Sequence, residues 1–440
     1  QRSGNGRHER YTRMLQYLGV HVIPDFKQMR EFTVREPYDF IFVARRDTFA
    51  AAGDLLHRHY PNTLIVFDTV DLHFLRERVR EQFIAEHQRD SGLLADVFGE
   101  AAAMLSNASE HARLRSLELG AVEASSVAIV VSEPERVALR HEMRTEGRWV
   151  PEIVVLANAH EPTPPTTTPY ALRHGIVFVG NFNHLPNRDA VLFFARQVLP
   201  RLLRVPMVRS DPQFVFHVAG ANKVPAAILA LNNSAPDGIV RVIVHGHVPD
   251  LRTLYANMRV SVAPLRWGAG VKGKVNTAHQ LGVPVVCTSI AVDGMHATDG
   301  EHVLLGDTPA QLAASVLHAY YNASVWHRLV THGARLLETR FSASRAAVGL
   351  LKTLSHLRDA NTLMSMKSLV LASERPRMYA DLRAAAALGG YYFNLTNLSP
   401  RLDFTEQAVA DDYTCTVEGA VQAPNAELAR AQGAHTSSLQ

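Results

Sequence analysis

Residues 264–286 read Pro264-Leu-Arg-Trp-Gly-Ala-Gly-Val-Lys-Gly-Lys-Val-Asn-Thr-Ala-His-Gln-Leu-Gly-Val-Pro-Val-Val286. An apolar run ends at Pro264, a glycine-rich segment follows, and a second apolar run begins at Pro284. This order predicts a strand, a glycine loop, a short helix and another strand. Such units build parallel sheets, which bind ligands beyond the carboxyl ends of their strands.

The glycine segment combines cations with flexible backbone. Its cations are Arg266, Lys272 and Lys274, and its glycines are Gly268, Gly270 and Gly273. Glycine adopts positive φ and lets the backbone approach a ligand closely, while the following helix adds amide donors and the positive end of its dipole. We predict a seat for a phosphate or pyrophosphate, with Lys274 as its first candidate ligand and Arg266 as its second. An exposed basic turn is the alternative.

Composition limits the classes of protein that fit. A chain of 440 residues, 47% hydrophobic and 20% charged, can form two to three domains with sizeable cores. The formal net charge of +3 is small, and basic residues are interspersed with acids, which argues against a nucleic-acid partner. Two cysteines, Cys287 and Cys415, exclude a disulfide framework and favour a reducing compartment. No apolar run reaches the roughly 18 residues of a membrane span.

Two series of apolar runs alternate with helical patterns. The first predicts strands at 20–24, 39–44, 63–68, 126–131 and 154–157, with a long helical region at 72–124. The second predicts strands at 176–179, 214–219, 240–244, 260–263, 285–288 and 303–305. A proline- and threonine-rich run lies between the two series. We predict an α/β fold of two Rossmann-like domains with parallel sheets facing a cleft. The expected parts are an acceptor-side domain at 1–160, a linker at 161–173, a second domain at 174–358 and a partly disordered extension at 359–440.

Several short motifs together give a family resemblance. Residues 174–341 resemble the C-terminal domain of retaining GT-B glycosyltransferases of family 4 (glycosyl transferases group 1). The motifs are Phe178-Val-Gly-Asn-Phe-Asn-His-Leu-Pro-Asn187, His245-Gly-His-Val-Pro-Asp250, the 264–286 stretch and Ala291-Val-Asp-Gly-Met295. Upstream, Asp68-Thr-Val-Asp-Leu-His-Phe-Leu-Arg76 and Val131-Ser-Glu-Pro-Glu135 are similar to the N-terminal domain of the same proteins. Those proteins have a further βα unit before the segment that begins near His8, so we expect an N-terminally incomplete chain.

The resemblance implies transfer of a sugar from a UDP- or GDP-sugar to a glycan, lipid or protein acceptor, with retention at the anomeric carbon. The donor would bind the C-terminal domain and the acceptor mostly the N-terminal one. Negative charge grows on the leaving diphosphate, and preorganised cations stabilise it. Arg266 and Lys274 would therefore act in catalysis. We expect no metal or other cofactor, because no Asp-X-Asp motif is apparent. We also expect a cytoplasmic location, or peripheral contact with the cytoplasmic face of a membrane.

One departure from the family pattern concerns the donor sugar. Many members carry two glutamates separated by seven residues, and those positions align with Ala269 and Thr277 here. Thr277 and its neighbour Asn276 can still bond a ribose hydroxyl. Asp293 is a candidate for the missing carboxylate, although an aspartate before a glycine is as readily a turn residue.

The remaining candidates follow predicted strands. Asp71, with Asp68 and His73, is expected to orient a sugar, and a helix-capping role is the alternative for the aspartates. Three donor contacts are expected after the strand at 176–179, where a plain turn is the alternative: Gly180, Asn183 and His184. We expect His245 to pack on the nucleobase side. With His247 it resembles a metal pair, but no third ligand is evident.

Three functions stay open at this point. The first is a retaining glycosyltransferase. The second is a non-catalytic GT-B relative that binds nucleotide-sugar or glycan, which Ala269, Thr277 and the incomplete N-terminus favour. The third is a sugar-nucleotide epimerase, which would share the phosphate seat.

Overall fold

The computed structural model describes residues 13, 15–17, 38, 40–60, 63–99, 108–160, 168–233 and 240–355. By its contacts the chain divides into two units, Tyr38–Gly389, and Gln1–Pro37 together with Gly390–Gln440. Both sheets belong to the unit Tyr38–Gly389. The strand predicted at 20–24 and the extension predicted at 359–440 lie outside the described residues.

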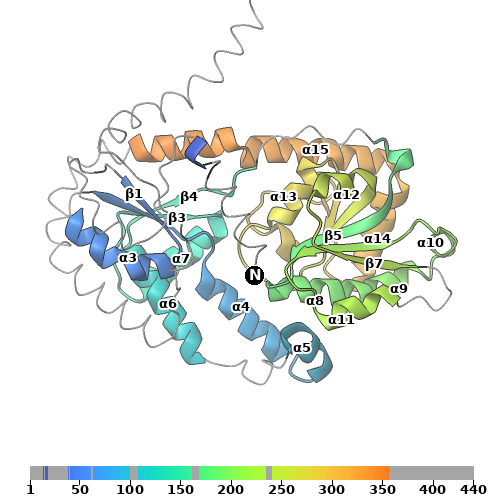
Figure 1. The fold of residues 1–440 in the computed structure, drawn as a ribbon, viewed down its shortest axis with the longest axis horizontal. Coiled ribbons are helices and arrows are strands. Elements are labelled where there is room, and N and C mark those ends of the chain that lie inside the picture. The colour runs from blue at the N-terminus through green and yellow to red at the C-terminus, as the bar shows by residue number, and fades with distance from the viewer. Residues whose placement is uncertain are drawn as a thin grey trace, which may run out of the picture. The chain divides into compact units, whose positions relative to one another are not determined.

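The first sheet has four parallel strands in sequential order (Figure 1). They are β1 (Phe40–Ala44), β2 (Leu64–Asp68), β3 (Val127–Val130) and β4 (Glu152–Val155). Each of the four strands predicted after residue 38 is present, and β4 begins two residues earlier than predicted. All residues of β3 are buried, as its unbroken apolar run requires in a parallel sheet.

Five helices accompany the first sheet. They are α3 (Arg46–His59), α4 (His73–Glu86), α5 (Ser91–Phe98), α6 (Ala108–Glu123) and α7 (Glu133–Thr145). The helical region predicted at 72–124 contains α4, α5 and α6, and Asp90 caps α5 by accepting from Leu93 N at 2.9 Å. Ser132 caps α7, since its Oγ accepts from Glu135 N at 3.4 Å.

The second sheet has six parallel strands in the order β10-β9-β8-β5-β6-β7 (Figure 1). They are β5 (His174–Asn181), β6 (Phe216–Ala221), β7 (Val242–Gly246), β8 (Met258–Ala263), β9 (Val285–Cys287) and β10 (Leu304–Leu305). All six were predicted, with ends shifted by at most two residues. The order reverses between β5 and β8, the kind of switch point where open α/β sheets bind ligands.

Helices connect these strands. The longer ones are α8 (Leu185–Phe193), α12 (Leu251–Asn257), α13 (Gly273–Gln280), α14 (Pro309–Tyr321) and α15 (Ala323–Phe341). The short ones are η2 (Tyr170–Leu172), α9 (Leu199–Leu202), α10 (Pro206–Arg209), α11 (Ala226–Leu229), η4 (Ala230–Asn233) and η5 (Ser289–Val292). A π-helical turn, Phe194–Val198, lies between α8 and α9. Residues 343–355 form a further helix, and its Leu350 and Leu354 pack against buried residues of the first sheet.

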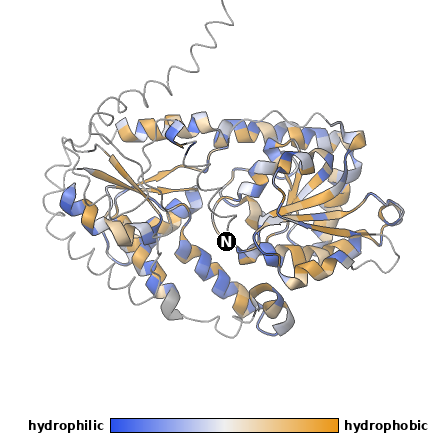
Figure 2. Ribbon diagram, in the orientation of Figure 1, coloured by the Kyte–Doolittle hydropathy of each residue, from blue (hydrophilic) through white to orange (hydrophobic). Residues whose placement is uncertain are grey.

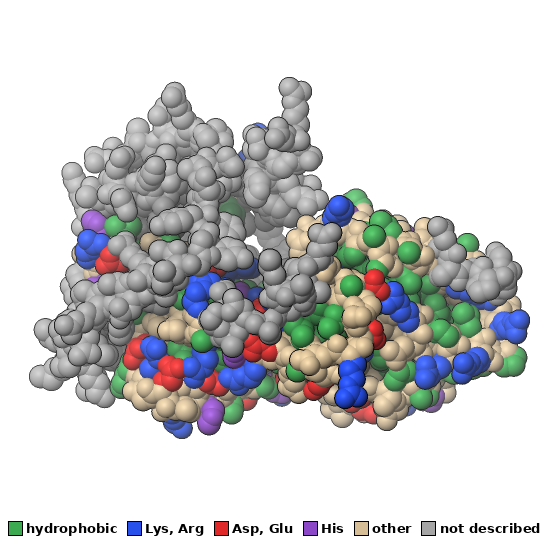
Figure 3. All heavy atoms as spheres, turned by 90° about the horizontal axis from the view of Figure 1, so that it is seen from below, with side chains coloured by type: hydrophobic (Ala, Val, Ile, Leu, Met, Phe, Trp, Pro, Cys, Tyr) green, Lys and Arg blue, Asp and Glu red, His purple; other side chains and the backbone are tan. Residues whose placement is uncertain are grey.

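The cores are apolar and the surface charges are mixed. Strands are hydrophobic throughout, whereas most helices carry one hydrophobic and one hydrophilic face (Figure 2). In the view of Figure 3, Lys and Arg side chains alternate with Asp and Glu. Part of that mixture consists of ion pairs such as Arg196–Asp96 at 2.6 Å. No helix in the described part of the chain has the length and hydrophobicity to cross a bilayer.

Candidate active site

The glycine segment between β8 and α13 lies against residues that follow strands of the first sheet. Gly268 and Gly270 have φ of 134° and 74°, which confirms the predicted positive φ at both. A Cβ at position 270 would lie 3.5 Å from Asp71 Cβ and 3.6 Å from Glu135 Oε1. The same prediction is wrong for Gly273, which begins α13 without a positive φ. The segment follows β8 and contacts residues that follow the carboxyl ends of β2 and β3.

Lys272 and Lys274 are half-buried cations at the entrance of α13. The ammonium of Lys274 donates to Asn187 Oδ1 and lies 4.3 Å from the centre of the Phe178 ring. The ammonium of Lys272 donates to the carbonyl of Gly270. In the described part of the chain, no carboxylate oxygen comes within ion-pair distance of either ammonium. The pair is thus a positive region bonded only to neutral oxygens.

Burial makes this positive charge costly. It lowers the pKa of Lys274 to about 7, with a further lowering from the charge of Lys272. It also lowers the pKa of Lys272 to about 8, although Asp293, Glu135 and Asp71 act in the opposite direction. An anion bound here would favour the charged form of both lysines. The predicted phosphate seat thus has the electrostatic character of an anion site.

Arg266 occupies a different place from the two lysines. Its Nε donates to Asp189 Oδ2 at 3.0 Å, its Nη2 pairs with Asp189 Oδ1, and its Nη1 lies 3.2 Å from His87 Nε2. The Asp189 side chain is fully buried, and a buried carboxylate needs such a partner. The guanidinium also lies 4.8 Å from the centre of the Phe193 ring. The structure therefore places Arg266 in an ion pair with the buried Asp189.

Trp267 anchors the glycine segment to α4 and α5. Its ring stacks on Phe83 at a centroid distance of 5.2 Å and on Phe98 at 5.9 Å, and the residue is 2% exposed. The sequence analysis did not select Trp267. Its position could have marked it, because a large aromatic side chain within a glycine loop is expected to be buried against other apolar residues.

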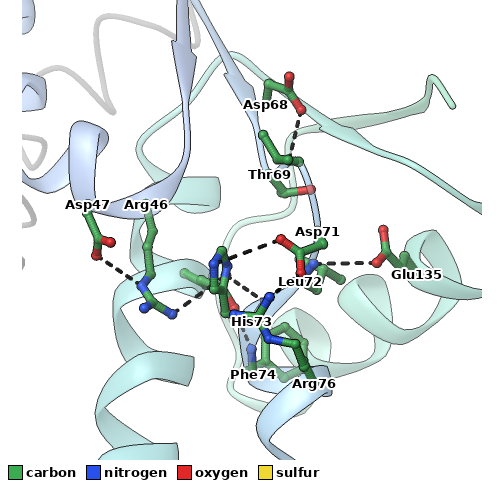
Figure 4. Close-up of polar contacts among 12 residues, drawn as sticks. Arg46, Asp47, Asp68, Thr69, Asp71, Leu72, His73, Phe74, Arg76 and Glu135 are labelled. Atoms are coloured by element: carbon green, nitrogen blue, oxygen red, sulfur yellow. Dashed lines mark hydrogen bonds and ion pairs between the residues drawn. The ribbon is translucent and has the colours of Figure 1, made fainter. Parts of the chain in front are cut away.

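Two carboxylates follow the strands of the first sheet at this place. Asp71 Oδ2 accepts from Arg76 Nη1 at 2.7 Å, and Asp71 Oδ1 lies 3.8 Å from His73 Nε2 (Figure 4). Glu135 accepts from the amides of Val131 at 3.1 Å and Leu72 at 3.4 Å. Burial raises the pKa of Glu135 to about 7, opposed by these two hydrogen bonds. Glu135 was not selected either, although the Ser132-to-Glu135 spacing of a capping box marks it.

Asp68 and His73 were expected beside Asp71, and they have different surroundings. Asp68 Oδ1 accepts from the amide of Val70, whose φ is 64°, so Asp68 holds the turn after β2. His73 is the first residue of α4, and its Nδ1 lies 2.8 Å from Glu118 Oε1. The two aspartates thus have different roles: Asp68 shapes the backbone, and Asp71 points toward His73 and Arg76.

Of the three candidates at and after the end of β5, His184 lies near the charges of Asp71, Arg76 and Lys274. Partial burial and the charges of Arg76 and Lys274 lower the pKa of His184, while Asp71 raises it. Asn183 is exposed, and its amide donates to Asn181 Oδ1 at 2.8 Å, as in a plain turn. At Gly180 a Cβ would lie 2.8 Å from Asn187 Cγ. Gly180 thus leaves space for Asn187, the residue that accepts from Lys274.

The three candidates for the sugar and ribose contacts, Asn276, Thr277 and Asp293, differ in exposure. Asn276 is completely buried in α13, and its side-chain amide has no hydrogen-bond partner among the described residues, so its role as a ribose contact stays a prediction. Thr277 is half-buried, and its hydroxyl donates to the Gly273 carbonyl at 2.9 Å. Asp293 is exposed and raises the pKa of Lys272. The next residue, Gly294, would place a Cβ 2.7 Å from Ser132 Cβ, so this loop also touches the first sheet's domain.

His245 pairs with a residue that the sequence analysis did not consider. It is exposed on β7 and stacks on His217 of β6 at a centroid distance of 5.2 Å, with His217 Nδ1 and His245 Nε2 2.9 Å apart. Burial and the neighbouring His245 lower the pKa of His217 to about 4. Within the described ranges, no group of three His, Cys, Asp or Glu side chains has the geometry to hold a metal ion.

A small cavity of about 200 Å³ lies on the other side of Arg266. Its lining comes from α5 and from α8 with the π-helical turn after it, and includes Asp90, Asp96, Phe193 and Arg196. Neither Lys272 nor Lys274 lines it. The positive region and the cavity are therefore separate features.

Comparisons with known proteins agree with this architecture. Residues 173–322 match the family model described as Glycosyl transferases group 1. The fold is similar to TarM (TM-score 0.53, 11% identity), covering 72% of this chain and 54% of TarM. It is similar to sucrose-phosphate synthase from Thermosynechococcus elongatus (TM-score 0.52, 16% identity), and the match covers 76% of this chain and 77% of that protein. It also resembles Anabaena HepE, solved in complex with UDP and glucose (TM-score 0.50, 12% identity, 72% and 78% covered).

These findings define the class of fold. The chain has an α/β fold of the GT-B type, and the region that matches the glycosyl transferases group 1 model is built around the second sheet. A search among curated protein sequences gives no match. The chain spans about half the length of TarM.

Proposed function

We propose that the protein is a glycosyltransferase that moves a sugar from a UDP- or GDP-sugar to a hydroxyl group of a glycan, lipid or protein acceptor, with retention of anomeric configuration. The observation that carries this proposal is the pair Lys272 and Lys274. Two half-buried ammonium groups with lowered pKa lie at a glycine loop and a helix entrance, bonded only to neutral oxygens. A diphosphate is the ligand that such a site favours.

The chemistry of the donor fits this arrangement. When the bond between the sugar and the diphosphate breaks, negative charge accumulates on the leaving oxygen. Lys274 can stabilise that charge with its ammonium, and the first amides of α13 can add to the effect. Because the free site is already desolvated, the lysines gain more from the developing charge than they would in water. HepE, with its UDP and glucose, supports the donor class by analogy of fold.

The first sheet's domain supplies the acceptor side. Its Asp71 and Glu135 lie beside Gly270, where they can accept hydrogen bonds from sugar hydroxyls. His184 is a further candidate, from the loop after β5 of the second sheet. Asp71 is our candidate for contact with the transferred sugar, because it lies next to Gly270 and is held by Arg76. Arg266 has no part in this proposal, since Asp189 and His87 occupy its guanidinium.

The full chain with a panel of UDP- and GDP-sugars, each with glycan, lipid and peptide acceptors, tests the proposal. We expect release of the nucleoside diphosphate that depends on both substrates, and a product with the donor's anomeric configuration in its proton NMR spectrum. Donor binding without release on any acceptor would contradict the proposal and favour a nucleotide-sugar-binding protein. Interconversion of free donor sugars would contradict it in favour of an epimerase.

A further inference from the structure

The Glu118 carboxylate of α6 receives three hydrogen bonds from the start of α4. Oε1 accepts from the His73 amide at 2.8 Å and lies 2.8 Å from His73 Nδ1, and Oε2 accepts from the Phe74 amide at 2.7 Å. Glu118 is 1% exposed. Arg46 Nη1 lies 4.0 Å from Oε1, so a cation stands near the buried carboxylate. Glu118 therefore fixes both the backbone and the ring of His73.

This contact determines which nitrogen of His73 carries a proton. An ionised carboxylate only accepts hydrogen bonds, so the neutral imidazole must donate from Nδ1. Nε2 is then left as an acceptor. It points toward Asp71, but the 3.8 Å separation from Asp71 Oδ1 is too long for a hydrogen bond (Figure 4). The His73 side chain retains 11% of its exposure, which leaves its edge accessible beside the proposed site.

We propose that Glu118 is a positioning residue for His73. It holds the ring in the Nδ1–H tautomer, so that Nε2 accepts a hydrogen bond from a sugar hydroxyl bound beside Asp71. The role of His73 in turnover rests on the glycosyltransferase function proposed above, whereas the tautomer does not. A carboxylate that orients an imidazole in this way keeps the ring in the one tautomer that can accept a proton at its far nitrogen.

A merely structural Glu118 predicts different results. Its bonds to the amides of His73 and Phe74 cap the first turn of α4, and that cap would act on stability whatever the state of the ring. Two measurements separate the roles, the tautomer of His73 and the dependence of the Glu118 effect on the His73 ring.

The experiment uses the full chain with ¹⁵N-labelled histidine and the variants Glu118→Gln, His73→Ala and the double variant. A glutamine has a single, uncharged acceptor oxygen for the three donors that the two Glu118 oxygens serve, so at least one donor loses its partner and the bond to the His73 ring loses its charge assistance. We expect the wild-type His73 signal, assigned by its loss in His73→Ala, to show protonated Nδ1, and that population to fall in Glu118→Gln. We expect Glu118→Gln to lower kcat by at least about tenfold with a small change in donor KM. In the His73→Ala background it should have no further effect on kcat.

Asn322→Ala serves as the control for a lost helix cap. Asn322 Oδ1 caps α15 by accepting from Val325 N at 3.1 Å, and we expect its loss to leave the His73 tautomer and kcat unchanged. Protonated Nε2 in neutral wild-type His73, or an equal loss of kcat from Glu118→Gln with and without the His73 ring, overturns the proposal. If no donor is turned over by the wild type, the glycosyltransferase function fails, and the tautomer measurement still decides whether Glu118 orients His73.

Discussion

Trp267 stacks on Phe83 with their ring centroids 5.2 Å apart and their planes inclined by 26°. Phe83 belongs to α4, whose first residue is His73, and Trp267 begins the glycine segment that leads to Lys272 and Lys274. Phe83 also stacks on His87, which contacts Arg266. One helix, α4, therefore contacts the glycine segment near its carboxyl end and begins with His73 at its amino end.

Loss of the Trp267 ring should destabilise the protein strongly. Trp267→Ala leaves a cavity against Phe83 and Phe98, and we expect a loss of roughly 3–5 kcal/mol in the free energy of unfolding. Urea unfolding followed by circular dichroism measures it. Trp149→Ala is the matched control, because Trp149 is 44% exposed and its loss should change stability by less than about 0.5 kcal/mol. Equal effects of the two substitutions would refute the anchoring role.

Lys274 should be needed for turnover and not for folding. Lys274→Met keeps an apolar stem over the Phe178 ring but removes the charge, so we expect donor-dependent turnover to fall by about 100-fold or more. Thermal unfolding should show an unchanged or higher midpoint, because the substitution removes a desolvated charge. Lys352→Met changes an exposed lysine of the helix at 343–355 and should leave turnover intact. Wild-type turnover in Lys274→Met would remove this residue from the phosphate site.

Binding of a diphosphate should weaken as pH rises above neutrality. The pKa values of Lys274 and Lys272 are lowered to about 7 and about 8, so both lose their protons between pH 7 and 9 in the free protein. A bound anion requires the charged forms, and binding must then take up protons. We expect the Kd for UDP, measured by calorimetry at pH 7, 8 and 9, to increase across the series.

The same lysines set the sign of the stability change in the free protein. Their ordinary pKa is 10.5, so the unfolded chain binds more protons than the folded chain between about pH 7 and 10.5. Their contribution to the free energy of unfolding therefore rises with pH over this window. Lys274→Met should reduce both pH dependences. A UDP affinity that does not change between pH 7 and 9 would argue against the lysine pair as the anion site.

The contact between Gly294 and Ser132 should be sensitive to a single methyl group. In Gly294→Ala the new Cβ would lie 2.7 Å from Ser132 Cβ, in addition to the strain of a φ of 72°. Gly300→Ala carries the same strain at a φ of 74°, with no atom within 4 Å of the new Cβ. We expect Gly294→Ala to cost about 1–3 kcal/mol more than Gly300→Ala in urea unfolding. The difference between the two variants isolates the contact, and a difference near zero would show that the contact is absent in solution.

Much of the fold was predictable because its signals are local. Unbroken apolar runs of four residues mark strands buried on both faces, as at β2 and β3. Glycines mark the positive φ at positions 268 and 270, and Ser132 marks the start of α7. The helical region at 72–124 was also predictable, whereas its division into α4, α5 and α6 was not specified, since one capping aspartate is a weak local signal.

The sequence by itself determined the two parallel sheets, the glycine loop and the presence of two lysines at a helix entrance, because periodicity and turn chemistry act over a few neighbouring residues. Only the tertiary structure decided how each charged group is used. Arg266 and Asp189 are 77 positions apart, and Glu118 and His73 are 45 apart, so no local pattern connects them. A buried carboxylate must find its donors wherever the packed elements bring them, and this requirement assigned Arg266 to an ion pair with Asp189 and Glu118 to the His73 ring.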